Sequence, residues 1–316
     1  MADRPPRLID LAPFNPIVDL RRVNDAVVTR AYRAGALAAR FTPGLVANGL
    51  VTPLGFGAQF ASAERRSVIE RNLRRADPTL RGLRLRRAVQ ESFDFYTKYY
   101  IESFRLPTMS RRTVNASFRE EGYHQIVEAR RQGTGVILAL PHLGGWEWAG
   151  RWLVDQGHPV TVVVEKLDPP ELYEWFVDLR EKLGMRVIAL GPDVAAGISK
   201  ALKDNHVVCL LCDRDIQRNG PEVEFFGETT SLPSGPALFG LRSDAPVLPT
   251  AVYFTDRFDG HLGAVGHPLP TERRGRLRED VNRITQDLAR RLEALIRRAP
   301  TQWHMFQPNW PSDPGY

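Results

Sequence analysis

Cysteine is almost absent from this chain of 316 residues, which contains only Cys209 and Cys212. Both lie in the apolar run 207–212, which has the pattern of a buried strand. Residues three apart on a strand point to opposite faces, so these thiols are poorly placed to form a disulfide or to share a metal ion. We interpret them as small core residues of a protein from a reducing compartment rather than as redox or metal-binding groups.

A long uninterrupted apolar run is absent as well. The first 15 residues lack an apolar core and a cleavage site, so we expect no secretory signal peptide. The most apolar early segment, residues 34–63, contains no stretch of the roughly 18 residues that a membrane-spanning helix requires which is both uncharged and uninterrupted by helix-breaking residues. Its interruptions are Arg40, Pro43, Asn48 and Pro53. We expect two short apolar helices or a helical hairpin there, either lying in a lipid interface or packing on the core as a soluble cap.

Lysine is missing from residues 1–90, which carry 16 arginines and seven acidic residues, an excess of nine positive charges. The rest of the chain has 27 basic and 30 acidic residues, so the net charge of +6 comes entirely from the first part. Such asymmetry indicates an anionic partner, either a nucleic acid or a lipid surface. No RNA- or DNA-binding motif accompanies the arginines and few aromatic residues lie among them. We therefore expect a membrane surface as partner and no nucleic acid.

No internal repeat or low-complexity tract divides the chain. Residues 17–130 have a mostly helical pattern, with helices expected at 63–75 and 83–105. Aromatic residues recur at helical intervals along the second of these helices, at Phe93, Tyr96, Tyr100 and Phe104. Such a stripe usually packs in the core, although it would also suit the border of a lipid pocket.

From residue 133 the pattern changes to apolar runs that alternate with helical segments. Strands are expected at 136–140, 160–164, 185–190, 207–212, 247–254 and 263–265. Helices are expected at 146–156, 170–183, 194–203 and 280–298. Strands separated by single helices form βαβ units. The sequence therefore predicts an α/β fold with a central, mostly parallel mixed sheet flanked by helices, and with an N-terminal helical region that faces a membrane.

His142 lies just past the strand expected at 136–140, and Glu147 comes five positions later, where a helix begins. Gly144 and Gly145 let the backbone turn sharply between them, so the two side chains can meet. A carboxylate on one imidazole nitrogen fixes the tautomer and leaves the other nitrogen to take a proton from an alcohol. No serine or cysteine nucleophile lies nearby, so this pair is expected to act on a hydroxyl of the substrate. The alternative is a loop histidine without a catalytic role.

Charged residues also follow two other expected strands: Glu165, Lys166, Asp213, Arg214 and Asp215. Ligands of parallel sheets bind beyond the carboxyl ends of the strands, where these residues and His142 would meet. Taken singly, each charged residue would serve equally well as a cap or in a surface ion pair. Their shared placement with His142 favours a functional site.

Several motifs follow one another in a fixed order along the chain. They are His142-x-x-x-x-Glu147 after Ala-Leu-Pro, Val-Glu165-Lys, Leu-Cys-Asp213-Arg214-Asp215, Phe225-Phe226-Gly227, Pro233-Ser-Gly-Pro236 and Trp303-His-Met-Phe-Gln-Pro-Asn-Trp310. Over roughly residues 65–312, this set resembles the bacterial lipid A late acyltransferase superfamily. Within the superfamily, the chain is similar to the phosphatidylinositol mannoside acyltransferases of actinobacteria.

The resemblance implies transfer of a fatty acyl group from acyl-CoA, with palmitoyl-CoA as the expected donor, to a mannose hydroxyl of a phosphatidylinositol mannoside. It implies a peripheral enzyme at the cytoplasmic face of the plasma membrane, without metal, for which acyl-CoA is a co-substrate rather than a cofactor. His142 would be the general base and Glu147 its orienting partner. Glu165 and Asp213 would line the sugar pocket or hold the dyad, with Arg214 near the phosphate-bearing groups. The superfamily more often has Asp at position 147 and Glu at position 213. The longer carboxylate at 147 is tolerable if the histidine backbone shifts slightly, and the shorter one at 213 bears on the acceptor more than on the chemistry.

Further substrate contacts are expected from Lys166, Asp215, Phe225 and Phe226. The two phenylalanines lie in a Gly/Pro-rich segment expected as a loop, where they either face the acyl chain or simply pack. The backbone amides of Gly144 and Gly145, at a helix start, are candidates for stabilising the tetrahedral oxyanion. His304 is interpreted as part of a C-terminal closing segment rather than as a catalytic group.

Two regions are expected within one integrated domain: a basic, helical, membrane-associating region at 1–130 and an α/β acyltransferase core at 131–316. One alternative function is acylation of another membrane lipid, either a lysophospholipid or a different glycolipid. A second is lipid binding by a homologue that has lost catalysis. Because the chain keeps both His142 and an acid at position 147, we favour an enzyme.

Overall fold

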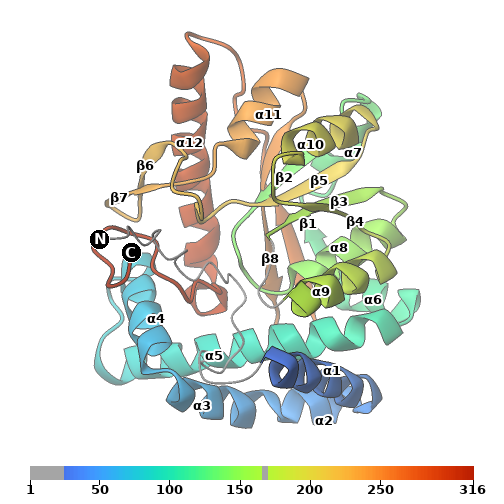
Figure 1. The fold of residues 1–316 in the computed structure, drawn as a ribbon, viewed down its shortest axis with the longest axis vertical. Helices are drawn as coiled ribbons and strands as arrows, with labels where there is room; N and C mark the ends of the chain where they lie inside the picture. The colour runs from blue at the N-terminus through green and yellow to red at the C-terminus, as the bar shows by residue number, and fades with distance from the viewer. Residues whose placement is uncertain (1–24, 166–169) are drawn as a thin grey trace, which may run out of the picture.

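The computed structural model describes residues 25–165 and 170–316. A seven-stranded sheet forms its centre, in the spatial order β1-β9-β8-β2-β5-β3-β4 (Figure 1). The strands are β1 (Phe118–Glu121), β2 (Val136–Leu140), β3 (Val160–Val164), β4 (Arg186–Ala189), β5 (Val207–Leu211), β8 (Val247–Phe254) and β9 (His261–Val265). Neighbouring strands are parallel except β8 and β9, which pair antiparallel. The predicted mixed and mostly parallel sheet is therefore confirmed.

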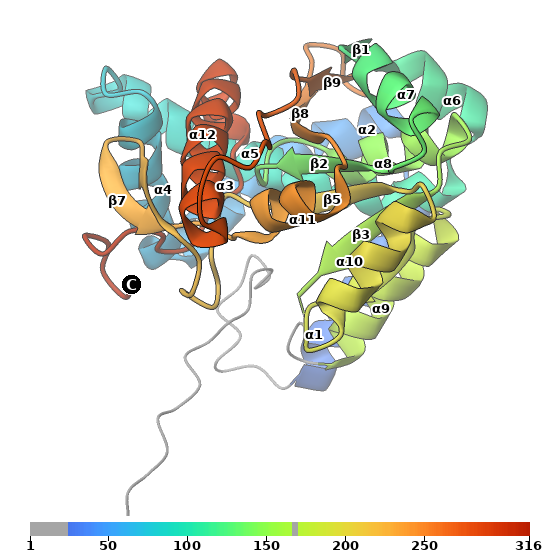
Figure 2. The same cartoon turned by 90° about the horizontal axis from the view of Figure 1, so that it is seen from above.

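Helices cover both faces of this sheet (Figure 2). Along β2, Ile137 and Ala139 pack on one face and Leu138 and Leu140 on the other, because side chains alternate along a strand. One face is covered by α10 (Val194–Lys203), α11 (Gly235–Ser243) and α12 (Leu277–Arg298), and the other by α6 (Arg111–Ser117), α7 (His124–Arg131) and α8 (Trp146–Asp155). A strand that is buried on both faces reads as one continuous apolar run, which is why β2 was recognisable in the sequence.

The N-terminal helices lie across one end of the sheet. They are α1 (Asp25–Phe41), α2 (Gly44–Gly49), α3 (Val51–Ala61), α4 (Ala63–Ala76) and α5 (Gly82–Arg105). In Figure 1, α5 crosses this end with α1, α2 and α3 on its outer side. The aromatic stripe of α5 is buried and packs partly on α9 (Pro170–Lys182), so its interpretation as core is confirmed. Within residues 25–165 and 170–316, no helix has both the length and the apolar character needed to cross a membrane.

Three strands escaped the sequence analysis. Strand β1 is short and its last three side chains are exposed, so it has no apolar signal. The segment expected as a loop contains an antiparallel hairpin, β6 (Glu222–Phe225) and β7 (Glu228–Ser231). The turn of this hairpin places Phe226 and Gly227 at positive φ angles of 53° and 78°. These strands are too short for alternation to be distinguished from an irregular segment.

Candidate active site

The topology brings His142 and Asp213 together. Strands β2 and β5 are adjacent and parallel, and Leu140 lies opposite Leu211. His142 and Asp213 each come two positions after this pair, so they lie side by side. The imidazole Nδ1 of His142 is 2.6 Å from Oδ1 of Asp213, and the backbone N–H of His142 donates to Oδ2 over 3.0 Å. The Asp213 side chain is completely buried, whereas the His142 side chain is 17% exposed at the edge of a cavity.

Asp213 is held in its ionised form. Burial raises the pKa of this carboxyl, but the charge of His142 and the hydrogen bonds from His142 and Trp303 outweigh burial and bring the pKa below its ordinary value. The indole N–H of Trp303 donates to Oδ2 over 2.8 Å. An ionised carboxylate only accepts hydrogen bonds, so Nδ1 of His142 carries the donated proton and Nε2 is the nitrogen that would act as base.

The carboxylate on the imidazole is thus not that of Glu147, and the expected His142–Glu147 pairing is corrected. Glu147 Oε1 lies 2.5 Å from Nη2 of Arg180 and accepts a hydrogen bond of 3.2 Å from the Tyr99 hydroxyl. Glu147 sits in the first turn of α8, which turns this side chain into the interior toward α5 and α9. Burial lowers the pKa of Arg180, but the adjacent Glu147 carboxylate outweighs it and raises the pKa, so the two form a buried ion pair.

The two glycines before α8 have different roles. Gly144 has φ of +60°, and a side chain there would come within 2.2 Å of the Val252 carbonyl oxygen, so only glycine fits. Its N–H donates to the Gln302 carbonyl over 3.0 Å, which removes it as an oxyanion donor and corrects that expectation. Gly145 is the N-cap of α8, where the positive end of the helix dipole favours a negative charge. Gly145 therefore stays a candidate oxyanion donor.

The remaining charged residues lie beside the dyad. Arg214 Nη2 donates to Glu165 Oε2 over 3.3 Å, and both residues line the same cavity as His142. Burial raises the pKa of Glu165 to about 7, against the opposing effect of Arg214. Asp215 also lines the cavity, while its Oδ2 accepts the Gly220 N–H over 2.7 Å and so fixes the following loop. Lys166 lies outside the described residues.

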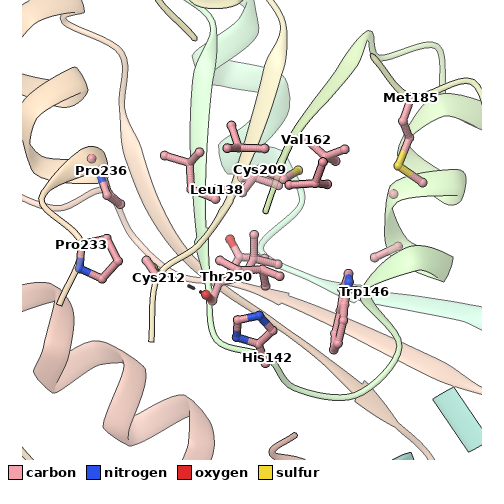
Figure 3. A pocket seen from close by; sticks show the side chains of 18 of the residues that line it. Leu138, His142, Trp146, Val162, Met185, Cys209, Cys212, Pro233, Pro236 and Thr250 are labelled. Carbon is pink, nitrogen blue, oxygen red and sulfur yellow. Dashed lines mark hydrogen bonds between the residues drawn. The ribbon is translucent and has the colours of Figure 1, made fainter. Parts of the chain in front are cut away.

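An apolar cavity of about 340 Å³ extends from His142 along the sheet. Figure 3 shows the imidazole of His142 near Trp146, with the side chains of Leu138, Val162 and Cys209 further along the wall. The α8 side of the wall is mostly apolar, although the Glu147–Arg180 pair also lines it. Its apolar residues include Leu138, Leu140, Ala149, Leu153, Val162, Cys209, Leu211 and Val252. Ligand pockets of this size and character hold apolar groups that a few polar residues orient. Burial raises the pKa of the Cys209 thiol to about 12, which makes it a neutral wall residue.

Phe225 and Phe226 do not reach this cavity, and the expectation that they bind substrate is corrected. Both are buried at the end of the β6–β7 hairpin, where their rings pack with Trp303 and Trp310. The hairpin docks on α12, which directs the two rings into the core. The sequence left open whether the two phenylalanines face the acyl chain or pack in the core, and in the structure they pack in the core.

The C-terminal segment provides contacts that the sequence analysis missed. Trp303 donates to the Asp213 carboxylate, and Asn309 Nδ2 donates to the Asp213 carbonyl over 3.1 Å. The N–H of His304 donates to the His142 carbonyl over 2.7 Å, in keeping with a closing segment. Burial lowers the pKa of His304 to about 3, so its imidazole is neutral. The Trp303–Trp310 motif was the available signal, but sequence alone does not say which of its residues faces the site.

The structure thus combines an α/β fold with a His142–Asp213 pair at the edge of an apolar cavity. The family model for bacterial lipid A biosynthesis acyltransferases matches residues 20–312, and the chain belongs to this family. It is 40% identical over 228 residues to the phosphatidylinositol mannoside acyltransferase of Mycobacterium tuberculosis (strain H37Rv), covering 70% of each chain. It is 35% identical over 292 residues to the enzyme of the same name from Mycolicibacterium smegmatis, covering 91% of this chain and 92% of that relative.

Proposed function

We propose that this protein transfers a long-chain acyl group from acyl-CoA to a mannose hydroxyl of a phosphatidylinositol mannoside. The observation that carries the proposal is the His142–Asp213 dyad at the end of an apolar cavity, next to the Glu165–Arg214 pair. The names of the relatives from both mycobacteria support this acceptor. The cavity supports the acyl donor, because its apolar wall suits a fatty chain and His142 lies where the thioester would be held.

In the proposed chemistry, Nε2 of His142 takes the proton of the mannose hydroxyl while the hydroxyl oxygen attacks the thioester carbonyl carbon. Asp213 stabilises the imidazolium that forms, as a buried carboxylate does in a catalytic triad. The N–H of Gly145, at the start of α8, is the candidate donor to the oxyanion. When the tetrahedral intermediate collapses, the carbon–sulfur bond breaks and the imidazolium gives its proton to the CoA thiolate.

The acceptor head group would lie against the charged side of the site. Glu165 and Asp215 offer carboxylate oxygens to sugar hydroxyls, and the guanidinium of Arg214 suits the phosphate of a phosphatidylinositol. Arg214 lines the cavity and is largely buried, and its Nε is without a hydrogen-bond partner among the described residues. Because the Arg214 side chain lines the cavity, the positive charge of its guanidinium supports an anionic ligand at this place.

We also propose that α1, α2 and α3 rest on the cytoplasmic face of the plasma membrane, where the protein would be peripheral. Large apolar side chains are exposed on these helices and at the junction of α2 and α3: Leu37, Phe41, Leu45, Val46, Leu50, Leu54, Phe56 and Phe60. These eight residues, here called the apolar face, outnumber the exposed large apolar side chains of the rest of the described chain, which are Leu83 and Phe258. An apolar face on a strongly arginine-rich region suits the interface of an anionic bilayer.

The test is to incubate the purified protein with labelled palmitoyl-CoA and purified phosphatidylinositol mannoside and to identify the acylated lipid. We expect acylation of mannose, and we expect His142→Ala to lower turnover by at least about 10²-fold while the protein stays folded. Lysophosphatidylinositol and an unrelated glycolipid serve as competing acceptors. A strong preference for either would replace the proposed acceptor. Retained transfer in folded His142→Ala would refute the base, and absence of transfer to every acceptor would favour a lipid-binding homologue.

A further inference from the structure

The C-terminal segment pairs with the turn that carries His142. Gly144 donates to the Gln302 carbonyl over 3.0 Å, and His304 donates to the His142 carbonyl over 2.7 Å. Between these bonds, Leu143 and Trp303 form an antiparallel bridge. The backbone of the turn is therefore fixed by a segment about 160 residues away in sequence.

The same segment fixes the carboxylate of the dyad. Oδ2 of Asp213 accepts the Trp303 indole N–H over 2.8 Å and the His142 backbone N–H over 3.0 Å. Two donors on Oδ2 prevent the carboxylate from rotating and leave Oδ1 directed at Nδ1 of His142, 2.6 Å away. Trp303 is only 4% exposed and Asp213 is fully buried, so no bulk water competes for these hydrogen bonds.

The position of the Trp303 ring does not depend on the dyad. The ring packs against Phe226 and Trp310, with centroid distances of 5.4 Å and 6.3 Å. Trp310 is itself held by its indole N–H, which donates to the Phe225 carbonyl over 3.0 Å. The segment is also tied to α4, because Asn72 donates to the Met305 carbonyl over 2.9 Å. A donor that is held from behind in this way can impose a geometry on Asp213 rather than follow it.

We infer that Trp303 is a positioning residue of the reaction, which acts through Asp213 by fixing the carboxylate and keeping it ionised. This inference rests on the proposed function, because it assigns Trp303 a part in the activity of the His142–Asp213 dyad. Trp303 touches no substrate in this mechanism. Its indole N–H replaces one of the hydrogen bonds that water would give to an exposed carboxylate, and its ring keeps that water out.

The test compares Trp303→Phe with Trp310→Phe. Both variants remove an indole N–H from the same aromatic cluster, but only the Trp303 indole reaches Asp213. For Trp303→Phe we expect kcat to fall about 10–100-fold with KM nearly unchanged, as for other groups that orient a catalytic side chain. The acidic limb of its pH profile should move to higher pH, because a less stabilised carboxylate favours the protonated imidazole. Trp310→Phe loosens the support behind Trp303 but keeps the indole N–H on Asp213, so it should lower kcat much less than Trp303→Phe and should leave the pH profile in place.

A double-variant cycle separates positioning from general loss of structure. If Trp303 acts through Asp213, adding Trp303→Phe to Asp213→Asn should lower kcat by less than about twofold further. An equal loss of kcat in both backgrounds, or equal losses in Trp303→Phe and Trp310→Phe, would overturn the inference.

A spectroscopic arm does not depend on turnover. In ¹H–¹⁵N spectra, Asp213→Asn should shift the Trp303 indole resonance and leave that of Trp310 in place. An unmoved Trp303 resonance would overturn the inference even if Trp303→Phe fails to fold. A wild-type protein without His142-dependent transfer, but with this shift, would instead refute the proposed function and leave the Trp303–Asp213 contact standing.

Discussion

Glu147 and Arg180 form an ion pair in the interior, with 2.5 Å between Oε1 and Nη2 and with side chains only 3% and 9% exposed. The Tyr99 hydroxyl completes this group by donating to the same carboxylate oxygen over 3.2 Å. Burial and the nearby carboxylate both raise the pKa of Tyr99, so its hydroxyl stays a donor. The acid of the His-x-x-x-x-Glu motif thus ties α8 to α5 and α9, and a different acid serves the imidazole.

The first prediction concerns the stability that this pair provides. Removing one partner leaves the other charge buried, which typically costs about 3–5 kcal/mol. We therefore expect Glu147→Gln to lower the free energy of unfolding by an amount of this order, measured by urea denaturation. The double variant Glu147→Leu/Arg180→Met should recover most of the loss, because apolar replacement of a whole buried pair is often nearly neutral. A Glu147→Gln protein as stable as wild type would contradict the buried pair.

The second prediction concerns the acid that does face His142. Asp213→Asn keeps the shape of the side chain but removes the charge that stabilises the imidazolium and fixes the tautomer. Loss of the orienting carboxylate lowers kcat by about 10⁴-fold in the chymotrypsin triad, and we expect a loss of about 10²–10⁴-fold here. Steady-state kinetics with saturating palmitoyl-CoA would measure it. Asp178→Asn, at an exposed position of α9, is the matched control, and it should keep kcat.

The sequence predicted which strand ends carry the site but not which side chains meet there. Alternating strands and helices imply a parallel sheet, so His142, Glu165 and Asp213 were expected at one edge. His142 and Glu165 line one cavity there, and the buried Asp213 is hydrogen-bonded to His142. Which acid contacts His142 depends on the order of the strands. Because β5 lies between β2 and β3, Asp213 is the near neighbour and Glu165 is one strand further away. The spacing of residues along the chain does not predict this spatial order of the strands.

Two other features were beyond the sequence for a similar reason. Glu147 is five residues from His142, but the helix that starts at Trp146 turns its side chain toward Arg180, which lies in a segment far along the chain. Trp303 reaches Asp213 from a C-terminal segment. The apolar and aromatic residues of this segment have no periodic pattern that would show which side chains face the site. Both contacts are set by tertiary packing and not by local propensity.

The third prediction tests the cavity as the acyl-chain site. Cys209 lies on its wall, and a phenylalanine there would fill part of the space along the sheet. We expect Cys209→Phe to shift the preference from palmitoyl-CoA toward shorter acyl-CoA, seen as a change in the ratio of kcat/KM values. Cys209→Ser, of nearly the same size, should keep the wild-type preference. If Cys209→Phe folds and still prefers palmitoyl-CoA to the same degree, the acyl chain of the substrate binds outside this cavity.

The fourth prediction tests the apolar face. The side chains of Phe41, Leu45 and Phe60 are 81%, 73% and 64% exposed. Each of these large side chains would become buried in the surface of a bilayer. Burial of such a side chain is worth about 1.5–3 kcal/mol, so a Phe41→Ser/Leu45→Ser/Phe60→Ser variant should bind anionic vesicles at least about 100-fold more weakly. Co-sedimentation with liposomes would measure this. The variant should still acylate acceptor presented in detergent micelles, which controls for its folding. Undiminished vesicle binding would refute the proposed surface.

The fifth prediction follows from Glu165, whose pKa burial raises from 4.5 to about 7. The folded protein therefore holds this proton more tightly than the unfolded chain does. The resulting stabilisation is fully present below the unfolded value of 4.5 and is lost as the pH rises through about 7. In Glu165→Gln the side chain is neutral at every pH, so this loss is removed. The variant should gain stability relative to wild type as the pH rises from about 5 to about 8, and the difference should then level off.

Urea denaturation of both proteins across this pH range measures the difference directly. Glu174→Gln, at an exposed position of α9, is the matched control, and its difference from wild type should not vary with pH. A Glu165→Gln difference that is equally flat would mean that Glu165 is ionised throughout. In that case the Arg214 charge, 3.3 Å away, would outweigh the burial of the carboxyl, and the acceptor would meet a fully charged ion pair instead of a site that can give up a proton near neutral pH.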